Sequence, residues 1–273
     1  MIDILNAFLS YSFLRNALLV GILVSLCCAL LGIPLVLKRY SMIGDGLSHV
    51  GFGAMSIALA FNLAPLYIAI PVVIIAAFLL LSISEKSKIG GDSAIALIST
   101  ASVAIGVMII SMTKGMTTDV SNYMFGSILV MTSSDVLLSI VSTVVVLILY
   151  ILFYNRIFAI TFDDSFAKAT GTNTTLFHSL IAVLTAVTIV VGMRMMGAML
   201  ISSLIIFPAL SALRICKSFG AVVITSAIVS VVAFIIGIIA SFILDSPTGA
   251  TVVIANLIIF IIFHIIGKIN NKN

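Results

Sequence analysis

Long uncharged runs, separated by short charged segments, dominate the chain. The runs cover residues 16–37, 46–84, 93–113, 136–155, 169–193, 195–213, 218–244 and 246–267. Charged side chains are costly at the centre of a bilayer, so they mark the ends of membrane helices. All runs but the second are close to the roughly 20 residues that a helix needs to cross hydrocarbon. The pattern predicts a bundle of transmembrane helices.

The second run, residues 46–84, is too long for one helix. Asn62, Pro65 and Pro71 interrupt it, and residues of this kind favour turns and helix ends. We therefore expect two helices joined by a short turn, and about nine spans (eight to nine) in all. No charged or polar stretch of about 50 residues remains for a separate soluble domain. The sequence predicts an all-α, polytopic membrane protein with one transmembrane domain over residues 1–273.

Composition supports this class. Hydrophobic residues make up 62% of the chain and charged residues only 8%, with a mean hydropathy of +1.38, far from the balance of a soluble domain. The three cysteines, Cys27, Cys28 and Cys216, are too few and too poorly spaced for a disulfide framework or a thiolate metal site.

The basic residues predict the orientation. If each run crosses once, one side carries Lys38, Arg39, Lys86, Lys88, Arg156, Lys168, Arg214, Lys217, Lys268 and Lys272, and the other carries only Arg15, Lys114 and Arg194. The positive-inside rule then places the C-terminus in the cytoplasm and the N-terminus outside. The net charge of +4 reflects this bias and does not indicate a nucleic-acid partner.

The stretch SMIGDGLSHVGFG, residues 41–53, carries two ionisable groups inside an apolar region. Asp45 and His49 are four residues apart, which places them on one face of a helix that starts near Ser41. A carboxylate oxygen and a neutral imidazole suit zinc or manganese. Two ligands are too few for a structural zinc site, so water or another helix would supply the rest. From the residues alone a bland alternative stays open, with Asp45 favoured by the helix dipole and His49 a packed core residue.

A polar insertion at about residues 156–178 contains a short helical segment from Asp163 to Thr170, ended by Gly171. Its acidic residues come first and Lys168 later, the order that the helix dipole favours. The segment is either an ordinary interfacial turn or a docking element whose apolar side fits a groove on a partner. That apolar side consists of Phe166, Ala167 and Ala169.

Enzymatic chemistry finds no support in the sequence. There is no G-x-x-x-x-G-K-[ST] for binding ATP and no H-E-x-x-H for a zinc protease,. No other run carries a central carboxylate to pair with Asp45 as an aspartyl protease requires. A transporter or a metal-gated channel remains, and an ion-coupled secondary transporter would also use an intramembrane Asp and His. His178 and His264, near the ends of their runs, are interpreted as structural.

Five blocks resemble a known family. They are KRYSMIGDGLSHVGFGAM, SNYMFGSILVMTSSD, TFDDSFAKATG, MGAMLISSLIIFPALSALR and DSPTGATVVIANLI, in this order along nearly the whole chain. They are similar to the signature blocks of the membrane permease subunit of bacterial ABC importers for zinc and manganese. NYMFGSIL, GAMLISSLIIFPA and DSPTG are more similar to the zinc-uptake branch, so zinc is expected first, with manganese or iron as the alternative.

The resemblance implies an ABC importer permease fold in a bacterial plasma membrane. Two copies of the permease would pair with two cytoplasmic ATPase subunits and receive metal from an external binding protein, either periplasmic or lipid-anchored. The chain would not be an enzyme and would hold no permanent cofactor, only the transported ion. Asp45 and His49 match the metal-pathway positions. The ATPase-coupling loop would include Asp163, Asp164, Phe166, Ala167, Ala169 and Gly171.

Overall fold

The structure is a computed structural model that describes residues 12–86, 91–113 and 133–270, and in these ranges the regular elements are all helices. The long helices are α2 (Ser12–Leu37), α3 (Ser41–Ala60), α4 (Pro65–Lys86), α5 (Gly91–Met112), α7 (Ser133–Leu152), α10 (Thr174–Met196), α11 (Ala198–Ile215), α12 (Phe219–Leu244) and α13 (Thr248–Asn270). Two short helices, α8 (Tyr154–Phe162) and α9 (Asp164–Ala169), lie between α7 and α10. The predicted all-α architecture is confirmed.

The long uncharged run forms two helices, as its turn formers predict. α3 ends at Ala60 and α4 begins at Pro65, because proline suits the first position of a helix. Asn62 in the turn has a left-handed backbone with φ 54°, a conformation that asparagine tolerates better than most residues. Pro71 does not break the chain and lies inside α4.

The predicted nine spans are not confirmed as such. By length and composition, seven of the described helices can cross a membrane, namely α2, α5, α7, α10, α11, α12 and α13. In α4 the apolar stretch is shorter, at Pro65–Leu81. α3 falls outside the seven because Asp45, His49 and many glycine and serine residues dilute its hydropathy, although it is 20 residues long.

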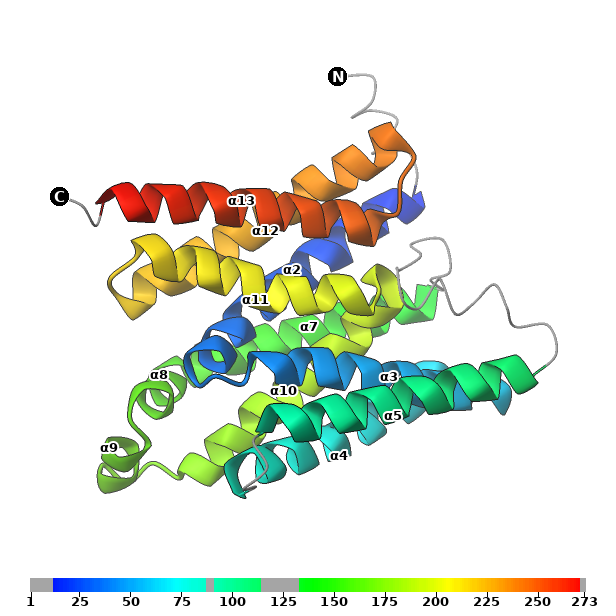
Figure 1. Cartoon of the computed structure of the whole chain (residues 1–273), viewed down its shortest axis with the longest axis horizontal. Coiled ribbons are helices and arrows are strands. Elements are labelled where there is room, and N and C mark those ends of the chain that lie inside the picture. The colour runs from blue at the N-terminus through cyan, green and yellow to red at the C-terminus, as the bar shows by residue number, and fades with distance from the viewer. Residues whose placement is uncertain (1–11, 87–90, 114–132, 271–273) are drawn as a thin grey trace.

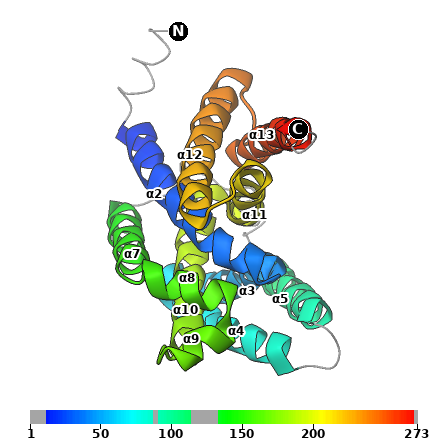
Figure 2. The same cartoon turned by 90° about the vertical axis from the view of Figure 1, so that its left-hand side faces the viewer.

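The centre of the bundle is formed by α2 and α10. In their most apolar windows 67% and 61% of the residues are buried, against 22% in α5. Figure 2 shows α2 passing between the α11–α12–α13 group and the remaining helices. α3 lies close to α5, and a Cβ atom added at Gly53 would come within 2.8 Å of the Ser102 carbonyl oxygen in α5. Glycine at this position therefore permits the close approach of the two helices.

The short helices gather at one end of the bundle. α8 and α9 lie at the same end as the C-terminal end of α13 (Figure 1). Aromatic side chains fix α8 at this place, since Phe158 and Phe162 lie against Phe219 at the start of α12, with ring centroids 5.0 and 5.8 Å away. Such ring pairs add to the stability that burial alone provides.

Candidate functional site

Asp45 and His49 lie side by side on α3, as their spacing predicts. The Nε2 atom of His49 is 3.5 Å from Oδ2 of Asp45, and the side chains are 28% and 41% exposed. α3 begins at Ser41, so at 1.5 Å per residue the two residues lie roughly 6 and 12 Å along its axis. Neither side chain is packed away in the core. Within one copy of this chain, His49 is less buried than a packed core histidine would be.

Both side chains face an open groove between α3 and α5. Its volume is about 680 Å³, and α3 contributes Met42, Asp45 and His49 to its wall. The α5 wall is made of small and apolar residues together with Ser99 and Thr100. The hydroxyl of Ser99 is buried and has no hydrogen-bond partner among the described residues. A cation or water in the groove would meet oxygen and nitrogen ligands on the α3 side.

Ser202 of α11 is a site residue that the sequence did not reveal. Its hydroxyl donates a hydrogen bond of 3.1 Å to Oδ1 of Asp45. The two residues are 157 positions apart, and Ser202 has no spacing relation that would single it out from Ser203 beside it. Because Ser202 occupies one carboxylate oxygen, the other oxygen, Oδ2, is left on the side of His49.

The site offers an incomplete set of metal ligands. In residues 12–86, 91–113 and 133–270, no group of three or more His, Cys, Asp or Glu side chains is placed to hold a metal ion. One carboxylate and one imidazole leave most positions of a divalent ion to water or to groups beyond the described chain.

The predicted helix of the polar insertion is confirmed as α9. The Asp163 side chain caps it by accepting hydrogen bonds from the backbone N–H groups of Ser165 and Phe166, at 2.8 and 3.0 Å, the usual role of an N-cap aspartate. Gly171 follows its end with a left-handed φ of 81°, which glycine adopts without strain. Phe166 is 63% exposed.

One detail of the predicted docking face is wrong. Ala167 is fully buried against the rest of this chain, so it cannot lie on a docking face with Phe166. In a single helical turn, neighbouring residues point to different sides, and Phe166 and Ala167 are neighbours. Phe166 and Ala169 remain exposed.

α9 is tied to two other segments through Asp164. Lys38, directly after α2, donates to Oδ2 at 2.7 Å, and His178 of α10 lies 3.0 Å from Oδ1. Burial acts to raise the pKa of the Asp164 carboxyl, but the hydrogen bond from Lys38 and the charge of His178 outweigh it and lower the pKa below the ordinary value of 3.8,.

Both remaining histidines make structural contacts. His178 contacts Asp164 as described, and the His264 ring lies 6.1 Å from the Phe260 ring within α13. Neither lines the groove of Asp45 and His49. Their interpretation as structural residues agrees with these contacts.

A buried ion pair at the other end of the bundle was also missed. Arg194 of α10 donates to Oδ1 of Asp135 in α7 at 2.6 Å, and the side chains are 14% and 11% exposed. The two residues are 59 positions apart, and no local spacing indicates that they pair. A signal was present, because Arg194 alone separates two apolar runs, and a cation so placed needs a carboxylate partner.

A family model and curated relatives match nearly the whole chain. The model of the ABC 3 transport family matches residues 10–267. The manganese transport system membrane protein MntC of Halalkalibacterium halodurans is 29% identical to this chain, and the match covers 92% of this chain and 86% of the relative. The high-affinity zinc uptake system membrane protein ZnuB of Haemophilus influenzae is 29% identical, over 92% of this chain and 97% of the relative. A probable iron transport system membrane protein of the same organism is 31% identical, over 98% of this chain and 99% of the relative.

A solved structure shares the fold. PsaBC from Streptococcus pneumoniae, in complex with Fab, contains a chain that is 26% identical to this one, with a TM-score of 0.86 over 96% of this chain and 95% of that chain.

The block SNYMFGSILVMTSSD falls mostly outside the described residues, whereas the other four blocks lie within them. The chain therefore belongs to the ABC 3 transport family, and is a membrane permease subunit of a metal ABC transporter whose ATPase is a separate polypeptide.

Proposed function

We propose that this permease carries a divalent transition metal into the cytoplasm, and that Asp45 and His49 bind the ion on its way. The observation that carries the proposal is their side-by-side placement, 3.5 Å apart, on the wall of an open groove. An aspartate at bilayer depth costs about 2.5 to 3.5 kcal/mol on insertion scales. A passing cation offsets that cost, whereas packing does not, because neither side chain is buried.

The groove supports a homodimer. In a single copy, the 41% exposed side chain of Asp45 would lie in a groove that opens toward hydrocarbon, which membrane proteins avoid for a charged group. A second copy placed against α5, whose most apolar window is only 22% buried, would close the two grooves into one polar pathway. Two-fold contacts of this kind are the commonest arrangement among soluble oligomers of one chain.

The cargo is a divalent transition metal, with zinc as the first choice. An oxygen and a nitrogen ligand suit zinc, iron and manganese alike. The relatives are named for manganese, zinc and iron, so they support manganese and iron as much as zinc. The zinc-like blocks of the sequence are the reason for the preference.

The topology we propose has nine spans, with α3 and α4 crossing beside the seven apolar helices, the N-terminus outside and the C-terminus in the cytoplasm. α8 and α9 share the end of α13 that carries the C-terminus (Figure 1), so they would face the cytoplasm. The exposed Phe166 on α9 then fits a groove on the ATPase subunit, and an external binding protein delivers metal at the opposite end. An ion-coupled secondary transporter would need no such partners.

The experiment is metal-stimulated ATP hydrolysis by the reconstituted complex of permease, ATPase and binding protein. Zinc, manganese and iron are compared for the wild type and for His49→Ala. We expect stimulation by the cargo metal in the wild type and its loss in the variant. Equal stimulation of both proteins would contradict the assignment of His49, and no stimulation by any of the three metals would contradict the assignment of the cargo.

A further inference from the structure

We propose that the ion pair of Lys38 and Asp164 is the link through which the docking helix α9 positions the start of α3, and with it the metal ligands. The inference rests on the proposed function, because it assumes that α9 contacts the ATPase. It adds Lys38 as a positioning residue and gives Asp164 of the coupling loop a role toward α3. Their role is to make metal passage depend on the state of α9.

The link joins three segments at one carboxylate. Lys38 binds Oδ2 of Asp164 at 2.7 Å and His178 binds Oδ1 at 3.0 Å. The two bonds use different oxygens, so α9 is held at once to the segment after α2 and to α10. Lys38 and His178 are mostly buried, and charge-assisted bonds of this kind are stronger than those between neutral groups.

The segment between Lys38 and α3 is short and rigid. Only Arg39 and Tyr40 separate Lys38 from the first residue of α3. Arg39 has a left-handed φ of 62°, and the Tyr40 backbone N–H donates to the Leu35 carbonyl at 2.7 Å while its carbonyl accepts from Ile43 N–H at 2.9 Å. A displacement of Lys38 is therefore passed to the first turn of α3, which carries Asp45 one turn later.

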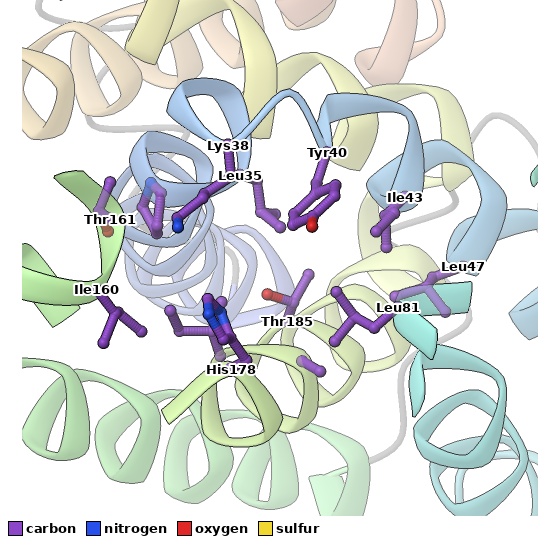
Figure 3. A pocket seen from close by; sticks show the side chains of 13 residues that line it. Leu35, Lys38, Tyr40, Ile43, Leu47, Leu81, Ile160, Thr161, His178 and Thr185 are labelled. Carbon is purple, nitrogen blue, oxygen red and sulfur yellow. The ribbon is translucent and has the colours of Figure 1, made fainter. Parts of the chain in front are cut away.

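A small cavity lies beside the segment that joins α2 to α3. It measures about 20 Å³, roughly the room that one water needs, and is lined by Lys38 and Tyr40, by Ile43 and Leu47 of α3, and by His178 and Thr185 of α10, among others. Figure 3 shows Lys38 and His178 on one side of it and Ile43 and Leu47 on the other. The buried hydroxyl of Thr185 has no partner among the described residues. The start of α3 is thus not fully packed against α10, which leaves it room to shift.

The test separates coupling from docking and from stability. The variants are Lys38→Met, Asp164→Asn, the double variant and Lys38→Arg, and the control is Lys268→Met, an exposed lysine of α13 with no ion pair among the described residues. Each permease is purified from cells with its ATPase subunit. The measured quantities are membrane abundance, the amount of ATPase that co-purifies, and metal transported per ATP hydrolysed after reconstitution.

We expect Lys38→Met, which lies outside the coupling loop, to keep wild-type abundance and ATPase content. Both single variants should lose about fivefold or more of the metal moved per ATP, the usual range of a coupling energy. The double variant should be no worse than either single one, because the residues act through each other, and Lys38→Arg and Lys268→Met should stay coupled. Wild-type coupling in either single variant would overturn the proposal. So would loss of Lys38→Met from the membrane, since it would assign the pair to stability.

The proposed docking of α9 on the ATPase subunit is tested by a separate variant. Phe166→Asp places a charge on the exposed apolar residue of α9 and should release the ATPase from the complex. If Phe166→Asp keeps the ATPase, the docking assignment is wrong, whatever the ratio measured for Lys38→Met.

Discussion

The hydroxyl of Ser202 donates to Oδ1 of Asp45 at 3.1 Å, so α11 fixes the carboxylate of a helix that lies far away in the sequence. His49 lies on the side of the other oxygen. The bond restricts the rotation of the carboxylate and keeps Oδ2 beside the imidazole. Loss of a neighbour that orients a ligand in this way typically lowers metal affinity by about tenfold to a hundredfold.

Ser202→Ala should weaken metal capture without stopping transport. A hydrogen bond to a charged group contributes about 1.5 to 3 kcal/mol, so we expect the apparent affinity for the metal to fall by about tenfold to a hundredfold. The measurement is the metal-concentration dependence of uptake. Ser203→Ala is the matched control, because that hydroxyl donates to the Leu200 carbonyl of its own helix. An unchanged affinity in Ser202→Ala would show that Asp45 needs no such support.

Asp163→Ala should loosen α9. The change removes the N-cap that accepts from Ser165 and Phe166, at a cost of about 1 kcal/mol. Amide hydrogen exchange across residues 164–170 should become faster, and less ATPase should co-purify. Asp163→Asn keeps a good cap and should behave as the wild type. If amide exchange in Asp163→Ala were as slow as in the wild type, contacts other than this cap would determine the stability of α9.

The contribution of Asp164 to stability should depend on pH in one direction. Its pKa is lower in the folded protein than the ordinary 3.8, so the folded state favours the ionised form. Its stabilisation is then complete above about pH 4 and is lost as the pH falls through the lowered pKa. The difference in Tm between wild type and Asp164→Asn should be constant near neutral pH and shrink below pH 3.8. A difference that persists undiminished in acid would contradict this account.

Arg194→Met should destabilise the fold strongly. The change breaks the buried pair of the Arg194 guanidinium and the Asp135 carboxylate, and the loss of one partner of such a pair typically costs about 3 to 5 kcal/mol. Thermal unfolding of the detergent-purified protein measures the loss. Lys268→Met, on an exposed surface, should stay within about 0.5 kcal/mol of the wild type. Similar stability of the two variants would indicate that Arg194 is solvated and not paired.

Local patterns predicted much of this fold. Charge-free runs located the helices because a charge is costly in a bilayer, and Asn62 and Pro65 marked the turn between α3 and α4. The Asp45–His49 pair follows from a spacing of four on one helix. Asp163 and Gly171 likewise act within a few residues of themselves, as cap and as helix end.

Contacts between distant helices could not be predicted in this way. Ser202 reaches Asp45 only because α11 lies beside α3, and Lys38 reaches Asp164 across 126 residues. The burial of Ala167 also depends on how α9 lies on the bundle, which the pattern of a single turn does not fix. Packing of the helices, and not their local sequence, brings these residues together.

Uptake of radioactive metal by cells that carry His49→Ala at wild-type membrane abundance tests the central claim most directly. Zinc, manganese and iron are supplied separately, with Ser56→Ala as a control, since that buried hydroxyl donates to the Phe52 carbonyl of its own helix. The account predicts that His49→Ala lowers uptake of the cargo metal by about tenfold or more, while Ser56→Ala transports normally. Wild-type uptake of all three metals by His49→Ala would contradict it.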